Sequence, residues 1–353
     1  MTIARKGDPA MELRWRELVV CDYEIELGDV GALVEYDLYG RGLQAAPRML
    51  LGEPAPLGIT RRPGVIDIPA ARYDDFCRRV RTRLLTLQGA LQARDVFDAA
   101  RARLSDAIHA LEVALIAAVP PAGLDELAMA LDEVMAFHTL NWMLPTREAA
   151  EHLSMLLGSA EAGRACLLAQ MVPTVPAHLL DVHALLLETS QTGDLAAFAD
   201  RAGYLQAQGM AKTAWENPAA VAASVAALRD RWAAEDHDDP SVQLTALHTA
   251  HQTADRRREA LYAAALLASA DDPAAYERTQ AIAVACRLAA DEEEYRKQAQ
   301  QRVLRGLRML GQAHGMDPTR LTLDQFIDLR CGPATDRPAA GADRGADAGR
   351  SPC

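Results

Sequence analysis

Apolar residues recur every three or four positions from about residue 70 to residue 311, and this spacing constrains the fold more than any other feature. Such a pattern predicts helices that each bury one face. The segment 273–311 is the most regular, with a stripe formed by Tyr295, Ala299, Val303, Leu307 and Leu310. About 40 residues at a rise of 1.5 Å would span about 60 Å, and a helix of that length usually forms the spine of a bundle.

Helix breakers divide this region. The first helix is expected at 72–91, where one stripe is formed by Phe76, Val80, Leu84, Leu87 and Leu91. The others are expected at 95–118, 124–140, 146–157, 160–171, 177–190, 194–207, 218–235, 241–269 and 273–311. Prolines and glycines separate them. Thr146 is expected to cap one helix, and Asp272 to cap the last one, with Pro273 at its first position.

Residues 18–69 have a different pattern. Three short β-branched stretches, LVVCDYEIEL, ALVEYDLYG and GVIDI, are separated by glycines and prolines, which predicts strands joined by turns. The expected fold is therefore mainly α, with a large helical bundle over 70–330 and a small N-terminal β-containing lobe over 18–69. Residues 1–17 are expected to be a flexible N-terminus, and residues 331–353 a disordered C-terminal tail.

Charge and cysteine content narrow the class of protein. A formal net charge of −12 argues against a nucleic-acid partner, because nucleic-acid binders usually carry a basic surplus. No apolar run reaches the roughly 18 residues of a membrane span, and the N-terminal sequence lacks the apolar core of a secretory signal. Six cysteines without a CxxC pair are typical of reduced thiols, which predicts a cytoplasmic protein.

Motifs of several enzyme classes are absent or incomplete. Residues 40–45 match the start of a dinucleotide-binding fingerprint, but the prolines that follow are expected to prevent the helix that such a site needs. No GxxxxGKS/T, HExxH or GxSxG motif occurs, which excludes P-loop NTPases, zincins and typical α/β-hydrolases. His248, His251 and Asp255 could share a helix face, yet their polar surroundings favour a solvated face, and we expect no metal or cofactor.

Three histidines are candidate catalytic groups. His138 lies on an otherwise apolar helix end beside Trp142, and His178 and His183 flank the apolar stretch AHLLDVHALLLE. A histidine in such a place is usually a hydrogen-bonded core residue. The alternative is an imidazole aimed into a ligand pocket between helices, where it can act as an acid or base near neutral pH.

Four stretches over roughly 165–330 carry a family resemblance. They are CLLAQMVPTVPAHLLDVHALLLETS (166–190), FADRAGYLQAQGMAKTAWENPAAVAASVAAL (198–228), DEEEYRKQAQQRVLRGLRMLGQAHG (291–315) and DPTRLTLDQFIDL (317–329). Trp215 to Pro218 form the clearest match. In this order the stretches resemble the helical middle region of the phosphoenolpyruvate-utilising family, which includes phosphoenolpyruvate synthase and, as the nearest analogue, rifampicin phosphotransferase.

The chain also departs from that family. The resemblance implies an ATP-grasp domain before this region and a swivelling phosphohistidine domain after it, and the sequence contains neither. The family's Gly-His-Arg is replaced by Gly203-Tyr204-Leu205. We therefore expect that this chain by itself does not carry out ATP-dependent phosphoryl transfer.

Three functions stay open. The first is a stand-alone, diverged domain of specialised metabolism that binds a small organic molecule and transforms it by ATP-independent acid/base chemistry, as a lyase, isomerase or cyclase. His138, His178 and His183 would be catalytic, and the substrate would be bound by Trp142, Arg164, Asp181, Tyr204 and Trp215. The second is the substrate-binding subunit of a split phosphotransferase, with separate ATP-grasp and phosphohistidine proteins as partners. The third is a non-catalytic helical interaction protein.

Overall fold

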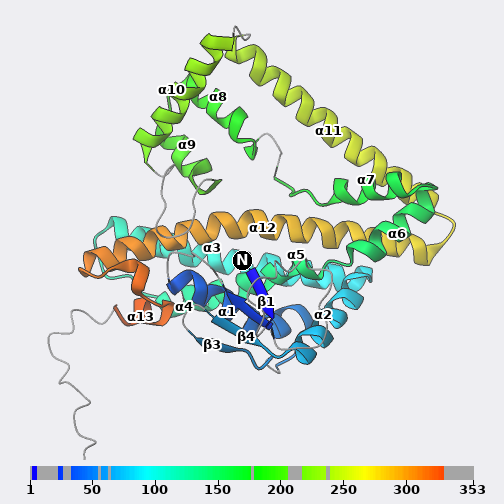
Figure 1. The fold of residues 1–353 in the computed structure, drawn as a ribbon, viewed down its shortest axis with the longest axis horizontal. Coiled ribbons are helices and arrows are strands. Elements are labelled where there is room, and N and C mark those ends of the chain that lie inside the picture. Colours follow the sequence, from blue (N-terminus) through cyan, green and yellow to red (C-terminus); the bar gives the residue numbers. More distant parts are fainter. Residues whose placement is uncertain are drawn as a thin grey trace, which may run out of the picture.

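The protein is mainly α-helical in the parts that the computed structural model describes, which are residues 2–5, 23–26, 33–54, 57–62, 65–175, 179–205, 217–235 and 239–329. The long helix α12 (Pro273–Ala313) crosses the molecule, and α3 (Leu87–Ile116) lies along it (Figure 1). On one side of this pair lie the N-terminal elements, and on the other side an arch of helices rises from it (Figure 1).

Helix α12 begins where local chemistry predicts. The Asp272 side chain accepts hydrogen bonds from the amides of Ala274 and Ala275, at 3.0 and 3.2 Å, and Pro273 occupies the first turn. Gly315 follows the end of the helix with φ at +67°, a conformation that glycine adopts without strain. The predicted cap is therefore confirmed, and the 41 residues of α12 extend about 60 Å.

Helices α3 and α12 run parallel, although their contacts join residues about 190 positions apart. Arg94 contacts Asp291 near the start of the pairing, Ser105 contacts Tyr295, and Glu112 contacts Arg302 further along. The interface is apolar between these contacts, with Phe97, Leu104, Ile108, Val303, Leu304 and Leu307 almost fully buried. This core fixes α12 rigidly against α3, so the side chains on its remaining faces have defined positions.

The N-terminal elements form an antiparallel sheet of four strands in the order β1-β2-β4-β3. These strands are β1 (Thr2–Arg5), β2 (Tyr23–Glu26), β3 (Thr60–Arg62) and β4 (Val65–Ile68). Strands β2 and β4 fall within two of the three predicted stretches. Residues 1–17 were expected to be flexible throughout, and this is wrong for residues 2–5. These residues form strand β1, which pairs with β2 in the register Thr2 to Glu26.

The prediction of a strand at 32–40 is wrong, because residues 33–40 belong to helix α1 (Leu33–Leu51). Every fourth residue from Val34 onward is buried, through Leu38, Gly42, Ala46 and Leu50. This spacing of four is helical, and the sequence stretch alone is too short to distinguish it from alternation. The expectation that prolines prevent a helix after the glycine motif is also wrong, because α1 contains Pro47. The glycines lie inside the helix, so no loop presents their amides to a nucleotide.

The predicted helix at 72–91 is two helices. Helix α2 (Ala70–Leu84) is followed by its C-cap residue Leu85. Helix α3 begins after Thr86, whose hydroxyl accepts a hydrogen bond from the Gly89 amide at 3.2 Å. The chain turns here without proline, and Leu91 is consequently 45% exposed rather than part of the buried stripe. A threonine cap is sufficient to end one helix and start the next.

Three further helices and two 3-10 turns of the described residues lie in the part of the molecule below α12. They are α4 (Leu124–Ala136), η1 (Phe137–Thr139), α5 (Leu140–Met143), η5 (Pro318–Arg320) and α13 (Leu323–Asp328). Helix α4 packs between α1 and α3, and η1 contacts α1, α4 and α12. This arrangement places His138 of η1 beneath α12.

Among the described residues, the arch above α12 contains α6 (Thr146–Leu157), α7 (Ala160–Gln170), α8 (Val182–Thr192), α9 (Leu195–Ala202), η3 (Gly203–Leu205), α10 (Pro218–Glu235) and α11 (Pro240–Ala268). Helices α8, α9 and α10 share one apolar cluster, and α6 and α7 share another with α11 and α12. In Figure 1, α11 returns from the top of the arch to the start of α12. The arch therefore contacts α12 through α6, α7 and α11 and, separately, through η3.

Among the described helices, none is long and apolar enough to cross a membrane. Cys77, Cys166 and Cys286 are free thiols. The predicted disordered tail at 331–353 and most of the predicted flexible N-terminus lie outside the described residues.

Candidate functional site

A polar stripe runs along the middle of α12, where the helix passes beneath the arch. Asp291, Glu294, Gln298, Gln301 and Arg305 follow one another at spacings of three and four, so they lie on one helix face. Polar side chains in the centre of a packed helix need partners. The partners of this stripe come from α3, from the chain after α7 and from η3.

Asp291 anchors the arch to the spine. Its carboxylate is 4% exposed and accepts hydrogen bonds from Arg94 Nη1 at 2.5 Å, from the Thr174 amide at 2.6 Å and from Thr174 Oγ1 at 2.9 Å. A buried carboxylate with three donors is satisfied. These contacts hold the chain after α7 against α12. Asp291 therefore positions this segment of the arch.

Tyr204 of η3 joins the stripe one turn further along. Its hydroxyl donates a hydrogen bond to Glu294 Oε1 and accepts one from Gln298 Nε2 at 3.3 Å. Gln298 Nε2 also donates to Glu294 Oε1 at 3.0 Å, which closes the three side chains into a ring of hydrogen bonds. Burial and the hydrogen bond to Glu294 raise the pKa of Tyr204, so the phenol keeps its proton at neutral pH.

A cavity of about 460 Å³ opens beside this ring, between η3, α9, α12 and α3. Its described lining includes four apolar residues, Val175, Leu179, Leu180 and Ala199. It also includes the polar residues Tyr204, Gln298 and Gln301. A concave space that combines apolar side chains with a small number of polar groups is typical of a small-molecule site.

Three arginines and one carboxylate line the rest of the cavity: Arg201, Arg302, Arg305 and Glu112. Glu112 of α3 holds Arg302 through two hydrogen bonds, Nε to Oε1 at 2.8 Å and Nη2 to Oε2 at 2.5 Å. Arg201 lies 3.8 Å from Glu188. The described lining residues therefore carry an excess of two positive charges, from three arginines and one glutamate.

The opposite side of α12 carries a second buried polar group. Glu292 is fully buried and accepts hydrogen bonds from Arg296 Nε at 2.8 Å and from Asn141 Nδ2 at 3.3 Å. Burial raises the pKa of Glu292 to about 7, although the neighbouring Arg296 opposes this shift. This carboxyl group titrates in the range where a general acid or base operates.

His138, a predicted catalytic residue, lies near this group. Its ring contacts Trp142 edge to face, with centroids 4.7 Å apart, and Tyr39 at 5.2 Å. Its Nδ1 is buried and has no hydrogen-bond partner. Burial and the charges of Arg296 and Lys297 keep the pKa of His138 well below its usual value, so the imidazole is neutral. The structure thus brings together two predicted residues, His138 and Trp142.

The other predicted residues are distributed over the arch. Asp181 caps α8 by accepting from the amides of His183 and Ala184, and its Oδ2 lies 2.8 Å from His251 Nε2. Partial burial raises the pKa of Asp181, but the hydrogen bonds from His251 and the two amides outweigh burial and lower it. His183 and Arg164 have exposed side chains on α8 and α7. His178 and Trp215 lie outside the described residues.

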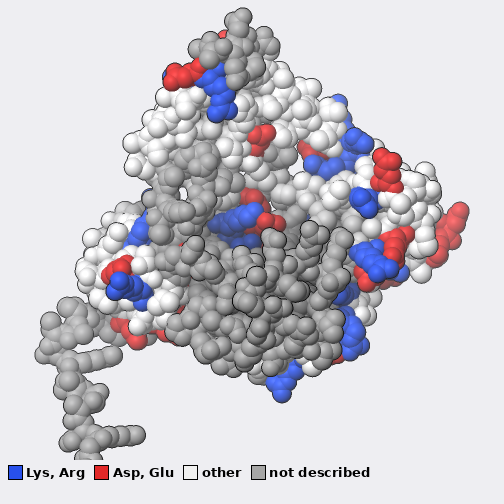
Figure 2. Space-filling model, viewed as in Figure 1, with Lys and Arg blue, Asp and Glu red and all other residues white. Residues whose placement is uncertain are grey.

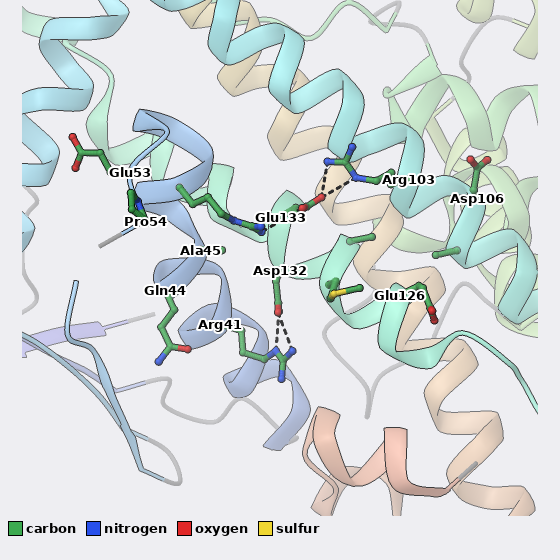
Figure 3. Close-up of a pocket in the computed structure, with 14 residues that line it drawn as sticks. Arg41, Gln44, Ala45, Glu53, Pro54, Arg103, Asp106, Glu126, Asp132 and Glu133 are labelled. Carbon is green, nitrogen blue, oxygen red and sulfur yellow. Dashed lines mark hydrogen bonds and ion pairs between the residues drawn. The ribbon is translucent and has the colours of Figure 1, made fainter. Parts of the chain in front are cut away.

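A second, larger cavity of about 760 Å³ lies between α1, α3 and α4 (Figure 3). Its arginines face carboxylates: Arg41 pairs with Asp132 at 2.8 and 2.9 Å, and Arg103 pairs with Glu133 at 2.9 and 2.6 Å (Figure 3). Arg48 also reaches Glu133, at 3.3 Å. These ion pairs join helices to one another, which gives this groove a structural role.

Of the predicted residues, Tyr204 alone lines the 460 Å³ cavity among its described residues. Sequence reasoning missed Gln298, Gln301 and Arg305, although their spacing from Asp291 was a visible signal. It also missed Arg201, which no local pattern distinguishes. No group of three or more histidine, cysteine or acidic side chains that could hold a metal ion occurs within the described ranges.

No protein family, curated protein or solved structure matches this chain. The resemblance to the phosphoenolpyruvate-utilising family accordingly stays a prediction. Arguments about function therefore depend on the geometry of the cavity itself.

Proposed function

We propose that this protein binds a small organic molecule in the 460 Å³ cavity beside α12 and acts on it by acid/base chemistry at Tyr204. The observation that carries the proposal is Tyr204, which lines the cavity and whose hydroxyl is held between Glu294 and Gln298. A side chain oriented by two partners and in contact with a ligand space is pre-organised for proton transfer.

The size and lining of the cavity suit such a ligand. Small-molecule sites commonly occupy about 300–1,000 Å³ and combine apolar walls with few polar groups. Leu179, Leu180 and Ala199 can cover an apolar part of the ligand, and the Gln298 and Gln301 amides can fix a polar part. Gln298 and Gln301 lie on α12, which packs along α3. These polar groups therefore keep their positions when a ligand binds.

The hydrogen bonds define one direction of proton transfer. A substrate proton passes to Tyr204 Oη while the phenolic proton passes to Glu294 Oε1, so that tyrosine stays neutral and Glu294 becomes protonated. The raised pKa of Tyr204 disfavours a free phenolate and therefore favours this coupled transfer. Return of the proton to another atom of the substrate completes an isomerisation. In an elimination the leaving group departs with its bonding electron pair and takes up this proton, which restores Glu294. Both belong to the isomerase and lyase classes expected from the sequence.

The predicted histidines have a secondary place in this proposal. His138 and His183 are not among the described residues that line the cavity, and η1 and α8 pack against different neighbours. Tyr204 and Glu294 supply the proton-transfer groups in their place. His138 and Glu292 remain candidates for a role on the other side of α12.

The experiment compares the full-length protein with Tyr204→Phe in a thermal-shift screen of small organic acids, amides and alcohols. A ligand at 100 times its Kd stabilises the folded state by about 2.7 kcal/mol. We expect at least one compound to stabilise the wild type and to act more weakly on Tyr204→Phe, because phenylalanine keeps the ring and loses the hydroxyl.

Tyr276→Phe is the matched control, because Tyr276 is a partly exposed tyrosine near the start of α12 and does not line the cavity among its described residues. It should respond like the wild type. The proposal is wrong if no compound stabilises the protein, or if every active compound acts equally on the wild type and on both variants.

A further inference from the structure

The cavity carries a charge opposite to that of the protein as a whole. The chain has 37 basic and 49 acidic residues and a net charge of −12, whereas the described lining of the cavity has three arginines and one glutamate. On the face shown in Figure 2, basic and acidic side chains of the described residues are interspersed. A local excess of arginine inside a ligand-sized space therefore requires an explanation.

The arginines come from two helices. Arg302 and Arg305 are three residues apart on α12, and Arg201 belongs to α9. The two ion pairs of Glu112 with Arg302 and of Glu188 with Arg201 involve side chains that are 35–48% exposed. Ion pairs with this much exposure are weak, so an incoming anion can compete for these guanidinium groups.

The described lining combines three kinds of side chain. Leu179 and Leu180 are apolar, Tyr204 and Gln298 are polar and uncharged, and the arginines contribute the positive charge. Arginine presents a planar fork of donors that matches the two oxygens of a carboxylate or a phosphate group. Such a lining fits an amphipathic molecule with an apolar body and one anionic end.

We propose that the ligand of this cavity is a small acid whose carboxylate or phosphate group is bound by Arg201, Arg302 and Arg305. This inference depends on the proposed function, since it names the class of molecule that the same cavity binds. The anionic group would hold the ligand so that its polar centre lies against Tyr204. The arginines are thus binding residues, and the proton-transfer groups remain Tyr204 and Glu294.

The test uses probes that differ only in charge. Benzoate, 2-naphthoate and indole-3-acetate are compared with their primary amides by titration calorimetry on the full-length protein, and phenyl phosphate and inorganic phosphate are added as further arms. At least one acid should bind about tenfold or more tightly than its amide, since hydrogen bonds to a charged group are the stronger kind. Raising the salt concentration should weaken binding of the acid and leave the amide unchanged.

Two variants locate the effect. Arg201→Gln and Arg305→Gln should each weaken binding of that acid by about tenfold and leave binding of its amide unchanged. Arg147→Gln is the control, because Arg147 is an exposed residue of α6 that pairs with Glu151. It should bind both forms like the wild type.

The outcomes separate the two proposals. Equal affinities for acid and amide, both reduced in Tyr204→Phe, would overturn the anion inference and leave the small-molecule function standing. Failure of every acid and every amide to bind would overturn both. Tight binding of inorganic phosphate alone, unaffected by Tyr204→Phe, would support the arginine site and contradict the part of the proposal that places an organic body in the cavity.

Discussion

Replacing Glu292 by glutamine tests how burial controls ionisation at the centre of α12. The carboxyl group is fully buried between Arg296 and Asn141, and burial raises its pKa from 4.5 to about 7. Between these two pH values the folded state holds a proton that the unfolded state has released. This contribution to stability is therefore fully present below pH 4.5 and is lost as the pH rises to about 7.

The size of the effect follows from the same two values. The difference between 4.5 and about 7 corresponds to about 3 kcal/mol of unfolding free energy. Glutamine has a similar shape and does not titrate, so the free energy that separates the wild type from Glu292→Gln should fall by about this amount between pH 4.5 and 7.5. In the variant, Arg296 loses its charged partner, which lowers the unfolding free energy by an amount that hardly changes with pH. The test therefore depends on how the difference in unfolding free energy changes with pH, and not on its size at one pH.

The assay is urea unfolding of both proteins at several pH values, followed by circular dichroism. Glu151→Gln is the control, because Glu151 of α6 is 61% exposed and forms a solvated pair with Arg147 at 2.9 Å. Its difference from the wild type should change little with pH. A difference between the wild type and Glu292→Gln that stays constant, or grows with pH, would show that Arg296 keeps Glu292 ionised and would refute this reasoning.

Three further substitutions or titrations check other parts of the structure. Gly42→Ala should lower the unfolding free energy by about 1–3 kcal/mol in urea melts, because its Cβ would lie 2.6 Å from Met135 Cβ; an unchanged midpoint would contradict the close contact of α1 and α4. Asp291→Asn should cost about 1–3 kcal/mol in the same assay, since the hydrogen bonds from Arg94 and Thr174 would lose their charged acceptor while Arg94 keeps its pair with Asp98, and an unchanged midpoint would contradict the anchoring role. The His138 ring should stay neutral in an NMR titration until well below pH 6.5, because it is buried near cations, and protonation at its usual pKa would contradict this environment.

Much of the helical architecture could be predicted because its signals are local. The cap at Asp272, the prolines at 145 and 240 and the glycines at 158 and 193 act on the few residues around them. The errors occurred where local signals conflict. Helix α1 contains glycines and a proline that normally oppose a helix, and its burial against α4 outweighs that preference.

The site could be predicted only in part. Tyr204 was singled out by a resemblance that remains a prediction, and the spacing of Gln298, Gln301 and Arg305 was present in the sequence without being recognised. The partner of Tyr204 could not be inferred, because Glu294 lies 90 residues further along the chain. The same holds for Asp181 and His251, which are 70 residues apart.

The sequence by itself determined the helix boundaries that have strong local signals, such as the cap at Asp272 and the glycine at 158, because these signals act over a few residues. It did not determine helix α1 or the break between α2 and α3. Only the tertiary structure decided that α3 and α12 run parallel, that Glu292 is fully buried, and that Tyr204 meets Glu294 beside three arginines. These features depend on contacts between residues about 90–190 positions apart. Such contacts form when apolar faces pack, and no local pattern specifies which faces meet.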